Sequence, residues 1–383
     1  MEITELLMKA VNNGASDIHL KAGHPPFFRI NGELIPQTEY DPLGPSDVAR
    51  LAYQMMNERQ RDYFMEHHEI DMALGLPGIG RFRVNIFQQR GSVAIALRVI
   101  PYEIRGFEEL NLPVKTLEKL SQELRGLILV TGPAGVGKST TLAAMIEYIN
   151  THRRCHIITI EDPIEYLFRD KLSIISQREV GVDTKSFLDA LKMALREDPD
   201  VIMVGEMRDF ETINTALLAA ETGHLVLSTL HTIDATETIN RIISVYPPHH
   251  QRQVRLQLAN VLRGIISQRL LPRADGNGRV PAVEILINTP RVKECIIDRE
   301  RTAEIPRAIA EGYVVYGSQT FDQSLMSLYK RGLITLEEAL RHCSNPDEFV
   351  LRVKGILGTS SMGWEVFETQ EGLKASGEED EEL

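Results

Sequence analysis

The sequence predicts an α/β protein built from about two domains. It has 383 residues, of which 43% are apolar and 6% aromatic, and a chain of this length suits about two domains of roughly 100 to 200 residues each. In its second half, short β-branched runs alternate with segments of helical periodicity, a pattern typical of helices packed on buried parallel strands. We therefore expect a small α+β domain, then an α/β domain with a mainly parallel sheet and C-terminal helices.

Residues 1–100 carry the signals of the small α+β domain. Apolar positions recur at helical spacing in Ile3–Asn12, and apolar and polar residues alternate over 15–20. Asn31-Gly32 stands between two short apolar runs, which predicts a hairpin turn. Two further strands are expected at 81–87 and 93–99.

The rest of the chain divides into a linker, a second domain and a tail. Residues 101–125 combine Pro, Gly and charged side chains, so we expect a linker there and the second domain at 126–355. Its expected strands are 127–130, 157–160, 201–204, 225–227 and, late in the chain, 282–287. Its expected helices are 140–149, 210–222, 234–245, 251–270, 321–330 and 336–342. Residues 356–383 end in a self-repelling acidic run, which predicts disorder.

Composition and charge exclude several classes of function. The formal net charge is -12, which disfavours a protein that binds nucleic acid by neutralising phosphates. The three cysteines, Cys155, Cys295 and Cys343, are far apart, so neither a disulfide framework nor a thiolate zinc site is expected. The sequence shows no signal peptide and no run of about 18 apolar residues. We expect a soluble, cytoplasmic protein that reaches a membrane only through partners.

The most specific motif is a phosphate-binding loop. Residues 132–139 fit the pattern G-x-x-x-x-G-K-[ST] and stand between an apolar strand and the helix expected at 140–149. The backbone N–H groups of such a loop point at phosphates, its lysine reaches the β- and γ-phosphates, and its serine hydroxyl can bind Mg²⁺. ATP and Mg²⁺ are therefore the predicted cofactors. The predicted nucleotide-binding residues are Gly132, Pro133, Ala134, Gly135, Val136, Gly137, Lys138, Ser139 and Thr140.

A first acidic strand end follows the loop along the chain. Glu161, Asp162 and Glu165 come after the strand expected at 157–160, and ligands of open α/β sheets bind at the carboxyl ends of strands. These acids would then face the Mg²⁺ and the water of the nucleotide site. The same residues can equally begin a turn before Pro163, and the pattern alone does not decide between the two interpretations.

A second acidic strand end resembles a Walker B element with one departure. Gly205 occupies the position where an Asp usually holds the metal, and Glu206 follows it. A carboxylate there can orient and deprotonate the attacking water. Without the Asp, Mg²⁺ would depend more on Ser139, phosphate oxygens and water, which suits its preference for keeping several waters.

Two histidines, His224 and His231, bracket the apolar run expected as a strand at 225–227. His231 stands at the carboxyl end, where a ring N–H can sense the γ-phosphate. Taken alone, a histidine beside an apolar run more often has a structural role.

Together, these motifs resemble the hexameric ATPases of the secretion superfamily. The segments that carry the resemblance are 16–20, 132–139, 160–165, 204–209 and 222–232. Within the superfamily, the chain is similar to the type IV pilus retraction ATPases, the PilT and PilU group, up to about residue 355.

The resemblance implies a PAS-like N-terminal domain and a RecA-like C-terminal domain, arranged as a ring of six with ATP at subunit boundaries. It also implies that Glu206 is the catalytic base, that Glu161 helps with the metal and water, and that His231 senses the phosphate. Mg²⁺ would then be held by Ser139, Glu161 and Glu206. In this family, arginines of the N-terminal domain reach the nucleotide, and the matching strands here carry Arg81, Arg83 and Arg98.

The resemblance further implies a biological role and partners. ATP hydrolysis would power pilus retraction and twitching motility from the cytoplasmic side of the inner membrane, at the pilus base. The partners would be a second copy of the chain, an inner-membrane platform protein and, indirectly, the pilin, with no nucleic acid. Extension ATPases of the family usually carry a tetracysteine zinc site, which this sequence lacks, so retraction is favoured.

One departure leaves a second hypothesis open. The family signature A-I-R-N-L-I-R-E is altered at 291–298, where Glu294 replaces Asn and Ile297 replaces Arg. The segment 319–323 and the acidic tail resemble the accessory PilU branch. The chain would then be an accessory ring protein or adaptor that supports a paralogous principal retraction ATPase.

Overall fold

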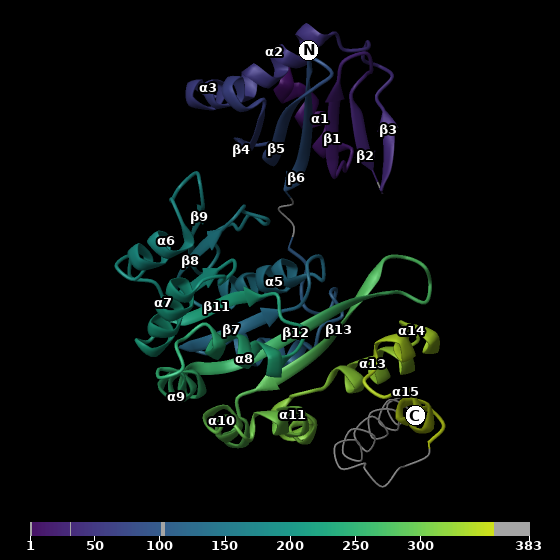
Figure 1. Ribbon diagram of the computed structural model, residues 1–383. Helices are drawn as coiled ribbons and strands as arrows, with labels where there is room; N and C mark the ends of the chain where they lie inside the picture. Colours follow the sequence, from purple (N-terminus) through teal and green to yellow (C-terminus); the bar gives the residue numbers. More distant parts are fainter. Residues whose placement is uncertain (1, 31, 101–103, 356–383) are drawn as a thin grey trace. The chain divides into compact units, whose positions relative to one another are not determined.

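The computed structural model describes residues 2–30, 32–100 and 104–355, and over this part the chain forms two compact units (Figure 1). The first unit consists of Met1–Glu103 and Glu165–Phe168, and the second contains the rest of the described chain. The tail predicted to be disordered, 356–383, lies outside the described residues. Within the described ranges, no helix combines the length and the apolar character needed to cross a bilayer.

The first unit is a six-stranded antiparallel sheet with three helices. The strand order is β3-β2-β1-β6-β5-β4. The strands are β1 (Asp17–Lys21), β2 (Phe27–Ile30), β3 (Glu33–Pro36), β4 (Glu69–Leu76), β5 (Gly80–Gln89) and β6 (Ser92–Ile100), and the helices are α1 (Ile3–Asn12), α2 (Pro45–Met55) and α3 (Glu58–His67). The helix and strands expected before residue 45 coincide with α1 and β1 to β3, and β2 pairs with β3. Asn31 of the expected turn lies outside the described residues.

Strand β5 shows how the first sheet buries one face. Phe82, Val84 and Ile86 are fully buried in a cluster that includes residues of α1 and α2, whereas Arg83 between them is exposed. Side chains alternate across a strand, so the apolar and charged residues of β5 fall on opposite faces. The sheet therefore packs its helices on one face and carries arginines on the other.

The second unit is built on a seven-stranded, mainly parallel sheet, which confirms the predicted fold class. Its order is β13-β12-β7-β11-β10-β8-β9, and only β13 runs antiparallel to its neighbour. The strands are β7 (Gly126–Thr131), β8 (His156–Glu161), β9 (Ile174–Glu179), β10 (Val201–Val204), β11 (Leu225–Leu230), β12 (Leu262–Pro272) and β13 (Arg279–Ile287).

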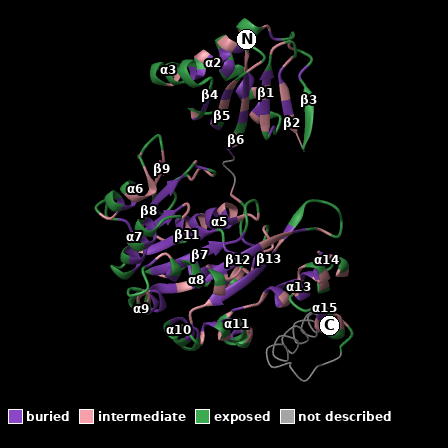
Figure 2. Cartoon of the chain, viewed as in Figure 1, coloured by how far each residue is buried: buried purple, intermediate pink, exposed green. Residues whose placement is uncertain are grey.

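Helices cover this sheet and extend beyond it at the C-terminal side (Figure 1). They are α4 (Val114–Ser121), α5 (Lys138–His152), α6 (Phe187–Ala194), α7 (Phe210–Glu221), α8 (Ala235–Ser244), α9 (Gln251–Val261), α10 (Pro290–Ile297), the 3-10 turn η1 (Thr302–Glu304), α11 (Ile305–Glu311), α12 (Tyr313–Tyr316), α13 (Phe321–Lys330), α14 (Leu336–His342) and α15 (Pro346–Val353). Every residue of β7 and β11 is buried (Figure 2). The central strands are thus accessible to a ligand only at their ends.

The helix predicted at 251–270 is wrong in its second half. Helix α9 ends at Val261, and β12 begins at Leu262 and pairs with both β7 and β13. The β-branched pair Ile265-Ile266 lies in the buried stretch 264–268, which favours a strand. Near the start of β12, Gly264 has little room for a side chain, because a Cβ there would lie 3.0 Å from Leu120 and 3.2 Å from a backbone oxygen of β13.

Candidate nucleotide-binding site

The predicted phosphate loop joins the end of β7 to the start of α5. Gly137, the residue before the helix, has φ +91°, a left-handed conformation that glycine adopts without a steric penalty. Gly132, at the start of the loop, has φ +141° and is also closely packed. A Cβ there would lie 2.6 Å from the carbonyl oxygen of Gln268 on β12 and 2.8 Å from a methyl group of Val136. Both glycines are therefore required by the shape of the loop.

Lys138 is held across this loop. Its side-chain Nζ donates to the carbonyl oxygens of Gly132 and Pro133, both at 2.8 Å, and the residue is only 9% exposed. Ser139 and Thr140 follow in the first turn of α5 and are half-buried. The N–H groups at the start of a 15-residue helix carry partial positive charge. Loop, lysine and helix end together offer a site for phosphate groups.

The other predicted residues follow the ends of neighbouring parallel strands. Strands β7, β11, β10 and β8 lie side by side in this order, so their carboxyl ends share one edge of the sheet. Glu161 is the last residue of β8, Glu206 follows β10 and His231 follows β11. The edge that carries the phosphate loop therefore also carries two carboxylates and an imidazole.

Glu206 and His231 lie beside each other at this edge. His231 Nε2 is 3.5 Å from Glu206 Oε2, and Arg208 Nε is 2.7 Å from the same oxygen. The side chain of Glu206 is 15% exposed, whereas that of Arg208 is 74% exposed. The guanidinium therefore covers the carboxylate while remaining free to move. Sequence reasoning gave no role to Arg208, although it follows Glu206 by two residues.

The end of β10 is fixed by hydroxyl groups of the adjacent β11. Ser228 Oγ donates to the carbonyl oxygen of Val204 at 2.7 Å, and Thr229 Oγ1 donates to that of Gly205 at 2.6 Å. These two bonds position the backbone immediately before Glu206. The carboxylate is thus presented by a rigid strand end and not by a loose loop.

The packing around Gly205 accounts for the missing Asp of the Walker B element. A Cβ at Gly205 would lie 3.2 Å from the carbonyl oxygen of Ile160 and 3.5 Å from the Cα of Glu161. Gly205 N also donates to that same Ile160 oxygen at 2.8 Å. An Asp at this position would require the end of β8 to move by a few tenths of an ångström. The second carboxylate of this edge comes from β8 itself.

That second carboxylate is Glu161, which is 7% exposed. Its Oε1 accepts hydrogen bonds from Thr159 Oγ1 at 2.7 Å and from Gln177 Nε2 at 3.1 Å. Gln177 lies on β9, a strand that the sequence analysis did not predict, so its role was missed. Its only sequence signal was the apolar pair Ile174-Ile175.

The donors for Mg²⁺ remain a prediction. Within the described ranges, no group of three or more His, Cys, Asp or Glu side chains has the arrangement of a metal site. The predicted set of Ser139, Glu161 and Glu206 contains two carboxylates and a hydroxyl, and oxygen donors of this kind suit Mg²⁺ bound mainly through phosphates and water.

The predicted arginines belong to the first unit. Arg81 and Arg83 lie on β5, and Arg98 lies on β6 directly opposite Arg83. Arg98 Nε donates to Asp17 Oδ1 at 2.9 Å, and its side chain is 70% exposed. Glu165 also belongs to this unit. The role of the three arginines toward a nucleotide remains a prediction.

His224 has a structural environment. Its Nδ1 lies 2.9 Å from the carbonyl oxygen of Ala219, in the last turn of α7. This contact satisfies one of the carbonyl groups that a helix end leaves without a partner.

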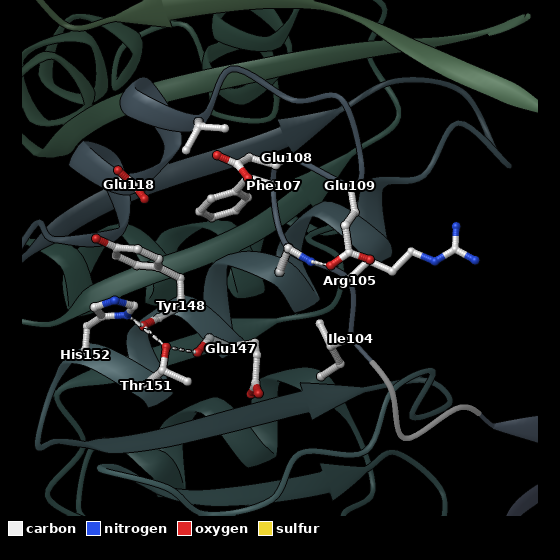
Figure 3. A pocket seen from close by; sticks show the side chains of 13 residues that line it. Ile104, Arg105, Phe107, Glu108, Glu109, Glu118, Glu147, Tyr148, Thr151 and His152 are labelled. Carbon is white, nitrogen blue, oxygen red and sulfur yellow. Dashed lines mark hydrogen bonds between the residues drawn. The ribbon is translucent and has the colours of Figure 1, made fainter.

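A cavity of about 320 Å³ lies elsewhere in the second unit (Figure 3). It is formed by the segment after residue 103, α4 and the C-terminal half of α5, and its lining includes Glu108, Glu109, Glu118 and Glu147. Four carboxylates repel phosphate groups, and the C-terminal half of α5 is far along the helix from Lys138. This cavity is therefore not the phosphate site.

The fold and the site define an α/β protein whose glycine-rich loop fits the P-loop pattern and lies at the carboxyl ends of parallel strands. The chain belongs to the Type II/IV secretion system protein family, whose model matches residues 1–320. This finding, with the relatives below, confirms the predicted resemblance to the PilT and PilU group.

Relatives with assigned names resemble the chain over almost its whole length. It is 46% identical to the type IV pilus retraction ATPase PilT of Pseudomonas aeruginosa, over 91% of this chain and 100% of that protein. It is 43% identical to the type IV pilus ATPase PilU of the same organism, over 97% of this chain and 96% of that protein. A crystal structure of the pilus retraction motor PilT with bound ADP has a TM-score of 0.82 at 52% identity, covering 91% of this chain and 98% of that one.

Proposed function

We propose that this chain is an ATP-hydrolysing motor that assembles as a homohexamer and powers retraction of type IV pili, and with it twitching motility. One observation carries the proposal: Lys138, Glu206 and His231 gather at one edge of the sheet in a chain that matches PilT over that protein's full length. The work would be done at the cytoplasmic face of the inner membrane, through a platform protein at the pilus base.

In the proposed reaction the phosphate loop binds the β- and γ-phosphates. Lys138 would exchange the carbonyl oxygens of Gly132 and Pro133 for phosphate oxygens, a change that replaces neutral acceptors with charged ones. Mg²⁺, when bound near Ser139 and Glu161, would neutralise part of the phosphate charge. ADP bound to the solved PilT structure supports nucleotide as the ligand of this fold.

Glu206 would accept the proton of the attacking water. Its carboxylate is partly buried and is positioned by a strand end, as a general base requires. Arg208 must first leave Glu206 Oε2 for the carboxylate to reach that water, and its exposure permits the movement. His231 lies 3.5 Å from the same oxygen, and it would couple binding of the γ-phosphate to the position of Glu206.

The experiment that tests the whole proposal is complementation. A strain that lacks the gene should lose pilus retraction, wild-type protein should restore it, and Glu206→Ala should assemble the same ring without restoring it. Normal retraction in the deletion strain, or full restoration by Glu206→Ala, would contradict the motor role.

A second candidate function is an accessory ring protein that supports a principal retraction motor. The match to PilU favours it, because it extends over more of this chain than the match to PilT. Within the altered signature, Glu294 forms an ion pair with Arg301 at 2.9 Å, and Ile297 is 38% exposed. The surface of α10 therefore differs from the one that the signature sequence would give.

Mixed-ring capture separates the two candidates. An accessory protein should bind the principal motor and show ATP turnover only in its presence, whereas an autonomous motor should turn over alone at the same rate.

A further inference from the structure

One residue outside the phosphate motif lies against both ends of the phosphate loop, at one end through its backbone and at the other through its side chain. Gln268 on β12 is 1% exposed, and its carbonyl oxygen is the atom that a Cβ on Gly132 would approach to 2.6 Å. Its side-chain Nε2 donates to Thr141 Oγ1 at 2.9 Å. Thr141 lies in the first turn of α5, and its N–H binds the carbonyl oxygen of Gly137 at 3.0 Å. Gln268 thus spans the loop from its first residue to its helix.

The strand that carries Gln268 is itself fixed at this level. β12 pairs in parallel with β7 up to Ser267 and Thr131, the last residue before the loop. Thr131 Oγ1 and Ser267 Oγ are 3.0 Å apart, and both residues are fully buried. Gln268 is the next residue along β12, so it continues the strand past the end of β7 and alongside the loop. Its position relative to Gly132 is therefore set by the sheet.

We propose that Gln268 is a positioning residue that sets the separation between the two ends of the phosphate loop, and thereby the affinity for nucleotide. The inference rests on the proposed nucleotide site. A loop whose ends are held at the correct distance pays less conformational entropy when its N–H groups close around phosphates. Gln268 does not touch the reacting atoms, so its effect passes through Gly132 and Thr141.

Packing alone does not explain an amide at this position. Within the described part of the chain, the Oε1 atom of Gln268 is buried and accepts no hydrogen bond. A buried acceptor without a partner is unfavourable, and an apolar side chain of similar shape avoids that penalty. The bond from Nε2 to Thr141 is the feature that methionine could not supply.

The test compares nucleotide affinity and stability in four variants. Gln268→Met and Thr141→Val each remove one partner, their combination removes both, and Thr141→Ser keeps the hydroxyl. ADP affinity, KM and kcat for ATP, and melting temperature are measured on the assembled protein. Gln323→Met is the matched control, because Gln323 is another buried glutamine of this unit, at the start of α13.

The inference predicts that Gln268→Met and Thr141→Val each weaken ADP binding and raise KM about fivefold, the equivalent of about 1 kcal/mol for one neutral hydrogen bond. kcat should change little, because the loop binds ground state and transition state alike. The double variant should be no weaker than either single one. Thr141→Ser and Gln323→Met should bind ADP as the wild type does.

Three results would overturn the inference while the wild type still binds ADP: unchanged affinity in Gln268→Met, additive losses in the double variant, or the same loss in Thr141→Ser as in Thr141→Val. The inference would also be contradicted if Gln323→Met lost ADP affinity in proportion to its loss of stability, because affinity would then follow general stability. A wild-type protein that binds no nucleotide would instead refute the proposed function itself.

Discussion

The two sheets of this molecule bury their strands in different ways. In the second unit every residue of β7 and β11 is buried, whereas in the first unit β5 alternates and β3 is exposed throughout (Figure 2). A parallel sheet covered on both faces can offer chemistry only at its strand ends. An antiparallel sheet packed on one face can present side chains along its whole surface. The second unit therefore concentrates its polar groups at one edge, while the first spreads its arginines over a face.

The largest effect should come from the packed face of the first sheet. Phe82→Ala removes a fully buried ring from β5, and the cavity should cost about 3–5 kcal/mol. Arg83→Ala, on the next residue and the opposite face, should change stability by less than about 0.5 kcal/mol. Hydrogen exchange of the β5 and β6 amides measures both. Equal effects would contradict the division of this sheet into two faces.

The second effect concerns the edge of the parallel sheet. Lys138→Ala removes the charged group that is held across the phosphate loop, and several charge-assisted hydrogen bonds to phosphate should be lost with it. ATP affinity should fall about 100-fold, as measured by titration of the assembled protein. Lys192→Ala, on the exposed side of α6, is the matched control and should bind as the wild type does. A similar fall in both variants would point to general electrostatics and not to this site.

The third effect is a pH dependence of the second unit. Glu284 on β13 is buried, and burial raises its pKa to about 7, although its Oε1 accepts a hydrogen bond from Ala235 N at 2.8 Å. The neighbouring charges are Asp234 and Asp322, which raise the pKa further, and Arg269, which lowers it. The folded state therefore keeps a proton on Glu284 that the unfolded chain releases near pH 4.5. The stability that this proton contributes is fully present below pH 4.5 and is lost as the pH rises to about 7.

Glu284→Gln should remove this dependence. The variant should be more stable than the wild type at pH 8 by roughly 1–3 kcal/mol, and the difference should disappear near pH 4. Thermal unfolding at the two pH values checks it. If Glu284→Gln is less stable than the wild type by the same amount at both pH values, the site requires the carboxyl group itself, and its protonation does not control stability.

The smallest effect lies on the open face of the first sheet. Arg98→Ala breaks the ion pair with Asp17, but the arginine side chain is 70% exposed, and pairs of this kind contribute less than about 1 kcal/mol. A role toward nucleotide would instead appear as slower ATP turnover at unchanged stability. Unchanged turnover would limit the arginines of this face to a structural role.

The difference between the sheets also explains which features the sequence could predict. Strands such as β7 and β11 are continuous apolar runs between helical segments, and the loop from Gly132 to Ser139 has a specific pattern, so fold class and phosphate loop were predictable. Helix α3 buries only Phe64, and its polar sequence gives no periodicity. Its capping box, formed by Asn57 and Gln60, was the one local signal.

Other features depend on contacts between distant segments. The hydrogen bond of Gln268 joins residues 127 positions apart, and the Gly205 backbone is shaped by Ile160 on another strand. Strand β12 was predicted as helix because the amphipathic pattern of α9 continues past Val261. The contacts of Gln268 and Gly205 leave no local pattern in the sequence, since each depends on the order of strands in the sheet.

The central claim is that the carboxyl edge of the second sheet hydrolyses ATP. Its most direct test is ATP turnover by the purified, assembled protein, wild type beside Glu206→Gln, with ADP affinity measured on both. The account predicts equal affinity and turnover at least about 100-fold lower in the variant, because the amide cannot accept the proton of the attacking water. Equal turnover in the two proteins, or a wild type that binds nucleotide and does not hydrolyse it even with Mg²⁺, would contradict it.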